Sequence, residues 1–128
     1  MNDSVLCCIT AQRSCLAILQ KGKEMADHLG CPVKAVSVQP LHAEAADRSA
    51  ALIHLDFLTK ESGVEIDVLY SDHPLLALAE YIETDPPIHI FTGKQAESGS
   101  FVMTLARHCK LPVSMVWGGH VYTLPTEE

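Results

Sequence analysis

The decapeptide FTGKQAESGS (91–100) carries the groups that most clearly suggest ligand binding. It begins as a buried strand would and ends as a helix would, and between them lie Gly93, Lys94, Gly99 and Ser100. A glycine loop before a helix can present backbone N–H groups to a phosphate, and Lys94 adds a positive charge. The five residues between Gly93 and Gly99 offer few amides for a triphosphate. Three interpretations stay open: a capping turn, which we favour, a small anion site, and a full ATP site.

The histidines and cysteines form no recognisable metal or redox motif. The seven histidines contain no H-x-x-x-H pair, and the five cysteines contain no C-x-x-C pair. We expect Cys7 and Cys8 to be core residues on opposite faces of one strand, and His89 to be a half-buried structural residue. No base, nucleophile and oxyanion hole come together. The sequence therefore predicts no metal site and no catalytic residues.

Composition predicts one globular domain over residues 1–128. Of these residues 48% are hydrophobic and 20% charged, as in ordinary folded proteins. The net charge of −7 argues against nucleic acid as a partner, because phosphate backbones attract clustered cations. No apolar run is long enough to span a bilayer, and the opening residues MNDSVLCCIT lack the positive charge of a signal peptide. We expect a cytoplasmic protein without a membrane partner.

Strand and helix patterns alternate along the chain, which is typical of an α/β fold. Strands are expected at 4–10, 33–38, 64–70, 88–93 and 112–117, and helices at 13–29, 43–62, 74–84 and 100–109. This alternation predicts a doubly wound five-stranded parallel sheet in the order 3-2-1-4-5, with helices on both faces. The pair Gly118-Gly119 is typical of a hairpin, so 120–124 can form a sixth, antiparallel strand. Ligands of such sheets bind where the strand order reverses, here between the first and fourth strands.

Two long segments resemble the universal stress protein family. VLCCITAQRSCLAILQKGKEMADHLGCPVKAVSV is similar to the family's opening strand, helix and second strand, and GSFVMTLARHCKLPVSMV (99–116) is similar to its closing Gly-Ser, helix and last strand. The likeness covers residues 4–117. Its opening also resembles the stress-protein-like domain of KdpD-type potassium-sensing histidine kinases. The resemblance implies a doubly wound fold, frequent dimerisation through the last strand, cytoplasmic regulatory roles and, in some members, ATP binding.

The family's ATP-binding members carry the motif G-2x-G-9x-G-[ST] after the fourth strand and an aspartate after the first. Gly93, Gly99 and Ser100 match its first glycine, last glycine and hydroxyl residue, but the middle glycine has no counterpart and Thr10 stands at the aspartate position. We therefore expect a non-enzymatic regulatory or stress-response domain without a full ATP loop. The alternative is an ATP- or AMP-binding switch. Any nucleotide or small anion would then contact Thr10, Ala11, Val38, Gly93, Lys94, Gly99 and Ser100.

The C-terminal strand is the expected site of a homodimer. Its run VSMVW is apolar and uncharged, and strand five is the outer strand in the order 3-2-1-4-5. Either the run after Gly118-Gly119 covers this edge within the chain, or a second copy pairs with it about a two-fold axis. Met115, Trp117 and Tyr122 would lie at the contact. A further protein partner is also possible for a regulatory domain.

Overall fold

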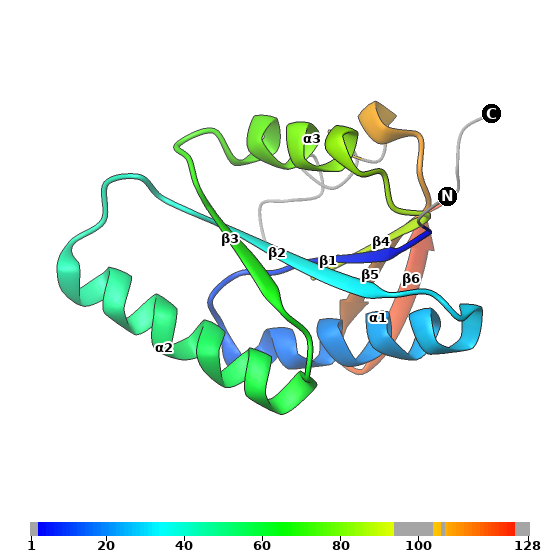
Figure 1. Ribbon diagram of the computed structural model, residues 1–128, viewed down its shortest axis with the longest axis horizontal. Coiled ribbons are helices and arrows are strands. Elements are labelled where there is room, and N and C mark those ends of the chain that lie inside the picture. The colour runs from blue at the N-terminus through cyan, green and yellow to red at the C-terminus, as the bar shows by residue number, and fades with distance from the viewer. Residues whose placement is uncertain (1–2, 94–103, 106, 125–128) are drawn as a thin grey trace.

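A six-stranded sheet forms the centre of the computed structural model, which describes residues 3–93, 104–105 and 107–124 (Figure 1). The strands are β1 (Val5–Cys8), β2 (Val33–Gln39), β3 (Ile66–Tyr70), β4 (His89–Gly93), β5 (Val113–Trp117) and β6 (His120–Leu124). The helices are the short 3-10 helix η1 (Arg13–Cys15), α1 (Leu16–Leu29), α2 (Ala45–Ser62) and α3 (Pro74–Thr84). The sheet order is β3-β2-β1-β4-β5-β6, with only β6 antiparallel to its neighbour, so the predicted doubly wound fold is confirmed.

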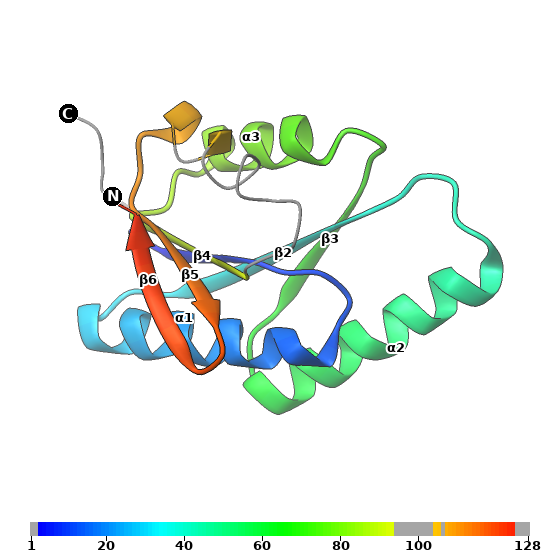
Figure 2. The same cartoon turned by 180° about the vertical axis from the view of Figure 1, so that it is seen from behind.

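The helices cover both faces of the sheet. In Figures 1 and 2, α1 and α2 lie on one face, and α3 lies on the other with the helical residues 104–105 and 107–109. The neighbours Cys7 and Cys8 pack into different apolar clusters on these two faces, as predicted. The strand pattern accounts for this arrangement, because successive side chains of a strand point to opposite sides. The part of the predicted fourth helix before residue 104 lies outside the described residues.

Strand β1 can occupy the centre of the sheet because its sequence, VLCC, has no charged or strongly polar side chain. All four of its residues are buried, and it pairs in parallel with both β2 and β4. By contrast, the sequence VEIDVLY (64–70) alternates apolar and acidic residues, which predicts a less covered strand, and β3 does form one edge of the sheet, with Asp67 and Tyr70 exposed. Gly30 and Gly63 end α1 and α2 in the left-handed conformation, at φ 71° and 74°, which glycine adopts without strain.

Of the two ways to cover strand five that the sequence leaves open, the structure shows the hairpin: residues 120–124 fold back as β6 and pair with β5 along its whole length, so β6 is the outer strand. Two leucines differ from what helical spacing predicts. Leu29 continues the apolar spacing of Leu19 and Ala26, which predicts burial, but it is 51% exposed, since Ala26 is the last buried residue of α1. Leu52 has helical spacing with Leu55, which again predicts burial, but it is 45% exposed, because the buried residues of α2 begin only at Leu55.

Helix α1 packs directly against β1 at Gly22. A Cβ atom added to Gly22 would lie 2.2 Å from the Sγ atom of Cys7, closer than any real contact. The thiol of Cys7 also donates to the backbone oxygen of Ile18, at 3.7 Å. Gly22 is therefore required for close packing of α1 on the central strand.

We predict that Gly22→Ala lowers the free energy of unfolding by about 2 kcal/mol, because overpacking outweighs the better helix propensity of alanine. Chemical denaturation measures this change. In a Cys7→Ala background the same substitution should cost nothing, because the clashing sulfur is gone. An equal loss in both backgrounds would contradict the packing explanation.

Candidate functional site

A cleft lies beyond the carboxyl ends of β1, β4 and β5, at the point where the strand order reverses. Its volume is about 190 Å³. The described residues that line it are Cys8, Thr10, Gln12, Ser14, Cys15, Ala17, Ile18, Gly93, Val116, Trp117, Gly118 and Gly119. Open α/β sheets bind their ligands at this position, so the cleft is the candidate site.

The structure brings together two of the seven residues that the sequence suggested for a ligand. Thr10 and Gly93 both line the cleft. Ala11 packs against the apolar cluster on the α1 face instead, and Val38 packs against the cluster on the α3 face. Lys94, Gly99 and Ser100 lie outside the described residues.

The loop from β1 to α1 is held by its own hydrogen bonds. The backbone N–H of Gln12 donates to the carbonyl oxygen of Thr10 at 2.9 Å, and that of Cys15 donates to Gln12 at 3.0 Å. The hydroxyl of Thr10 lies 3.5 Å from the Sγ atom of Cys15. Thr10 therefore connects the end of β1 to the start of α1, while the side chains of Gln12 and Ser14 are exposed at the cleft.

Gly93 has a packing role in addition to any role in a ligand loop. A Cβ atom there would lie 3.0 Å from the Cδ1 atom of Ile18, tighter than most real contacts. A larger residue would push against α1 and narrow the cleft. A loop glycine that the sequence associates with phosphate is thus also explained by the approach of β4 to α1.

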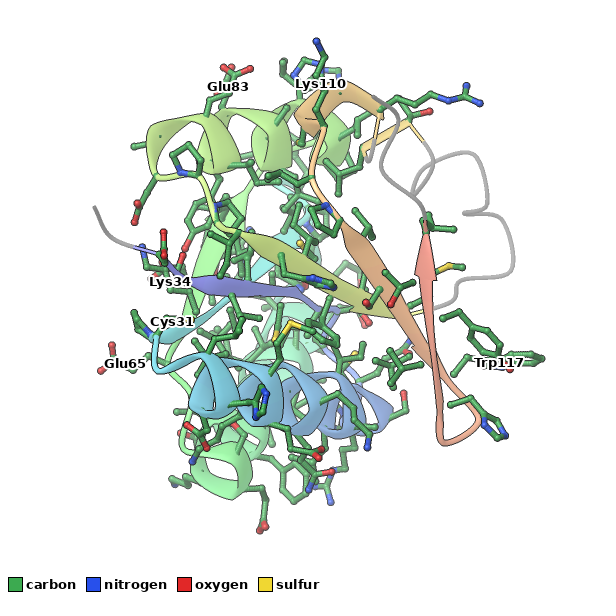
Figure 3. All side chains as sticks on the ribbon, turned by 90° about the vertical axis from the view of Figure 1, so that its right-hand side faces the viewer. Cys31, Lys34, Glu65, Glu83, Lys110 and Trp117 are labelled. Atoms are coloured by element: carbon green, nitrogen blue, oxygen red, sulfur yellow. The ribbon has the colours of Figure 1, made fainter. Side chains whose placement is uncertain are left out.

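One wall of the cleft was not predicted from the sequence. Trp117, Gly118 and Gly119 contribute to it from the turn between β5 and β6. Trp117 is 53% exposed and projects from the outer part of the hairpin (Figure 3). The Gly-Gly turn was recognised as a hairpin, and its place at the carboxyl end of β5 was the signal that could have located it beside Thr10.

The described lining can form hydrogen bonds but holds no charge. Thr10, Gln12 and Ser14 supply hydroxyl and amide groups, and Ala17, Ile18 and Val116 form an apolar surface. Burial raises the pKa of the Cys8 thiol, which therefore stays protonated at neutral pH. The volume is below the roughly 300–1,000 Å³ of typical small-molecule sites. Within the described residues, the cleft suits a small ligand held by neutral hydrogen bonds.

A serine and a histidine do meet elsewhere, in the interior of the sheet. The Nε2 atom of His89 lies 2.7 Å from Oγ of Ser114, which lies 2.8 Å from Oγ1 of Thr123, so the contacts cross β4, β5 and β6. Burial lowers the pKa of His89. Ser114 is fully buried, so its hydroxyl cannot reach a substrate. His89 is a half-buried structural residue, as expected.

A second hollow, of about 420 Å³, lies between α3 and the first residues of β2 and β3. Lys34 pairs there with Asp85, and the hydroxyl of Tyr81 donates to Asp67 at 2.6 Å. Burial, together with this hydrogen bond, raises the pKa of Tyr81. Figure 3 shows Lys34 at this end of the sheet. The two pairs, Lys34 with Asp85 and Tyr81 with Asp67, are typical of a structural network.

Two searches of the described residues found nothing further. In residues 3–93, 104–105 and 107–124, no three histidine, cysteine, aspartate or glutamate residues are placed to hold a metal ion. In the same part of the chain, every helix is too short or too polar to cross a bilayer.

Comparison with solved structures finds the same fold in universal stress proteins. One from Archaeoglobus fulgidus superposes with a TM-score of 0.72 at 18% identity, over 91% of this chain and 95% of that one. Another, in complex with cAMP, gives 0.68 at 13% identity over 90% and 96%. The A. fulgidus protein in complex with dAMP gives 0.64 at 19% identity over 91% and 98%. No protein-family profile and no curated protein sequence matches the chain.

We predict that His89 makes the protein less stable in acid. Because its pKa is lowered by folding, the unfolded chain binds more protons once the pH falls below about 6.5, and stability drops from there downward. Melting temperatures between pH 8 and 5 should fall less steeply in His89→Gln, whose amide can still bond to Ser114. Identical slopes for His89→Gln and the unmutated protein would refute the assignment.

Proposed function

We propose that the chain is a cytoplasmic member of the universal stress protein family that acts as a regulatory domain and catalyses no reaction of its own. Two independent lines support this: the sequence resemblance over residues 4–117, and a fold that matches solved universal stress proteins over nearly their whole length. Fold alone does not specify function, so the argument depends on the cleft. The resemblance of the opening sequence to the stress-protein-like domain of KdpD-type sensor kinases stays a prediction.

The observation that carries the proposal is the character of the cleft. Thr10 replaces the aspartate that the resemblance associates with adenosine contacts, and the described lining has no charged side chain. A neutral hydroxyl accepts a weaker hydrogen bond than a carboxylate does. Its bond to Cys15 also commits that hydroxyl to the loop. These features favour weak nucleotide binding, and they leave the described lining of the cleft without an acid or base.

The second candidate is a nucleotide-binding switch. Two of the similar structures are complexes with cAMP and with dAMP. The cleft of this chain lies at the strand-order reversal where such sheets bind ligands, and Gly93 keeps it open beside Ile18. Binding of an AMP-like ligand is therefore the main alternative to the first proposal.

We also propose a homodimer, with its contact moved from β5 to β6. Strand β6 is the outer strand, and its sequence HVYTL has no charge and no proline to discourage pairing. Val121 and Tyr122 are 42% and 45% exposed, on opposite faces of that strand. The other edge, β3, carries Asp67, which opposes pairing. Met115 lies opposite Tyr122 within the chain, and Trp117 lies opposite His120, so the contact centres on Val121 and Tyr122.

Thr10→Asp tests the character of the cleft. For the unmutated protein we predict that millimolar AMP, cAMP or Mg-ATP raises the melting temperature by less than about 1 °C. A ligand at a hundred times its Kd would add about 2.7 kcal/mol of stability and shift the melting temperature by several degrees, so a small shift means weak binding. Thr10→Asp should increase the AMP shift, whereas Thr10→Asn, of similar size and without charge, should not. A shift of several degrees in the unmutated protein would instead establish the nucleotide switch.

Sedimentation tests the dimer. We expect the unmutated protein to sediment as a dimer at about 100 µM, and Val121→Lys and Tyr122→Lys to sediment as folded monomers, because charge on an edge strand opposes pairing. Leu29→Lys changes an equally exposed leucine far from β6 and should leave the dimer intact. A well-folded monomer in the unmutated protein at this concentration would rule the dimer out.

A further inference from the structure

A small apolar hollow lies between the first half of α2, the segment after β2 and the end of β3. Its volume is about 80 Å³, and Pro40, Ala51, Leu52 and Tyr70 are among the residues that line it. Leu52 and Tyr70 are 45% and 43% exposed. A hollow of this size accommodates an apolar side chain from outside. We call the hollow and its rim the α2 corner.

The part of α2 that forms this corner does little for the core. Residues 44–50 are all exposed, and the buried residues of α2 begin at Leu55. In Figure 1 this half of the helix extends away from the sheet. Ile53, next to the hollow, is 63% exposed. An amphipathic helix normally buries its apolar face, so these side chains mark a surface for a partner.

The charged residues of the corner are Arg48, which lines the hollow, and the carboxylates Glu44 and Asp47. Arg48 is engaged by the chain itself: its Nη2 atom donates to the carbonyl oxygen of Leu41 at 2.8 Å, and its guanidinium lies 5.4 Å from the centre of the Tyr70 ring. Glu44 and Asp47 are exposed on the first turns of α2. The rim therefore presents carboxylates around an apolar centre.

We propose that the α2 corner docks an amphipathic helix of a partner protein that is apolar on one face and basic on the other. An apolar side chain of that helix enters the hollow between Leu52 and Tyr70, and its lysines or arginines lie beside Glu44 and Asp47. Helix-in-groove recognition combines these two elements. A second copy fits poorly, because this chain carries a net charge of −7 and would bring its own acidic rim.

The helix that carries the corner also contacts the loop beside the candidate cleft, in its second half. The guanidinium of Arg13, in η1, lies 4.3 Å from the centre of the Phe57 ring in α2. Arg13 lies between Gln12 and Ser14, which line the cleft. The inference rests on the proposed regulatory function, since it supplies the surface through which such a domain would act.

A synthetic peptide tests the proposal. The probe is a fluorescein-labelled helix of about 16 residues, long enough to form in water, with leucines on one face and lysines on the other. At about 150 mM salt, anisotropy should show saturable binding, and Leu52→Glu and Asp47→Lys should each weaken it by about tenfold or more. Leu29→Glu, which adds the same charge at another exposed leucine, should leave the affinity unchanged. The same peptide with glutamates for lysines should not bind.

Amide chemical shifts locate the bound peptide. The proposal expects changes concentrated at residues 39–53 and 69–72. Absence of binding, equal affinity in Leu52→Glu that circular dichroism shows to be folded, or shifts centred on β6 or the 10–15 loop would each overturn it. Probe binding requires neither nucleotide nor catalysis. A nucleotide-loaded or catalytic chain would therefore refute the proposed function and leave this result unchanged.

Discussion

The contact between Gly22 and Cys7 is the constraint on which the rest of the structure depends. Because Gly22 has no side chain, α1 lies directly against the central strand, and Ile18 one turn earlier reaches both the Cys7 thiol and Gly93. This position sets where α1 begins, and so where the 10–15 loop must cross from β1. The cleft follows from it, since its walls are that loop, the first turn of α1 and the ends of β4 and β5. A looser helix would move Thr10 away from Gly93.

Within this geometry the described cleft holds few reactive groups. It offers hydroxyls, an amide and buried thiols, while some charged groups pair with one another elsewhere, as Lys34 does with Asp85 and Lys60 with Asp56. Two surfaces remain uncommitted within the described chain: the outer strand β6 and the first half of α2. These surfaces fit the proposed regulatory function, in which the domain acts by binding other proteins.

The sequence predicted elements well because local signals and tertiary packing agreed. The continuous apolar run of β1 placed it at the centre, the alternation of β3 placed it at an edge, and Gly118-Gly119 predicted the hairpin. Contacts between residues far apart in the sequence could not be predicted in the same way. Leu52 has helical spacing with Leu55, but spacing cannot show that α2 extends beyond the sheet. Gly22 has helical spacing with Leu19 and Ala26, which predicts that it is buried, but no local pattern shows which atom it contacts. Trp117 lies at the cleft because β5 pairs with β4, which pairs with β1, and these long-range pairings cannot be predicted from composition.

Native mass spectrometry of the protein purified without added nucleotide tests the central claim most directly, that the cleft is not a high-affinity nucleotide site. The account predicts that each protomer has the mass of the polypeptide alone, 13.9 kDa, in whatever oligomer it forms. Gentle desolvation should preserve any tight complex, so a ligand retained from the cell would be visible as added mass. One AMP, ATP or cyclic nucleotide per protomer would contradict the account and make the chain a nucleotide-dependent switch.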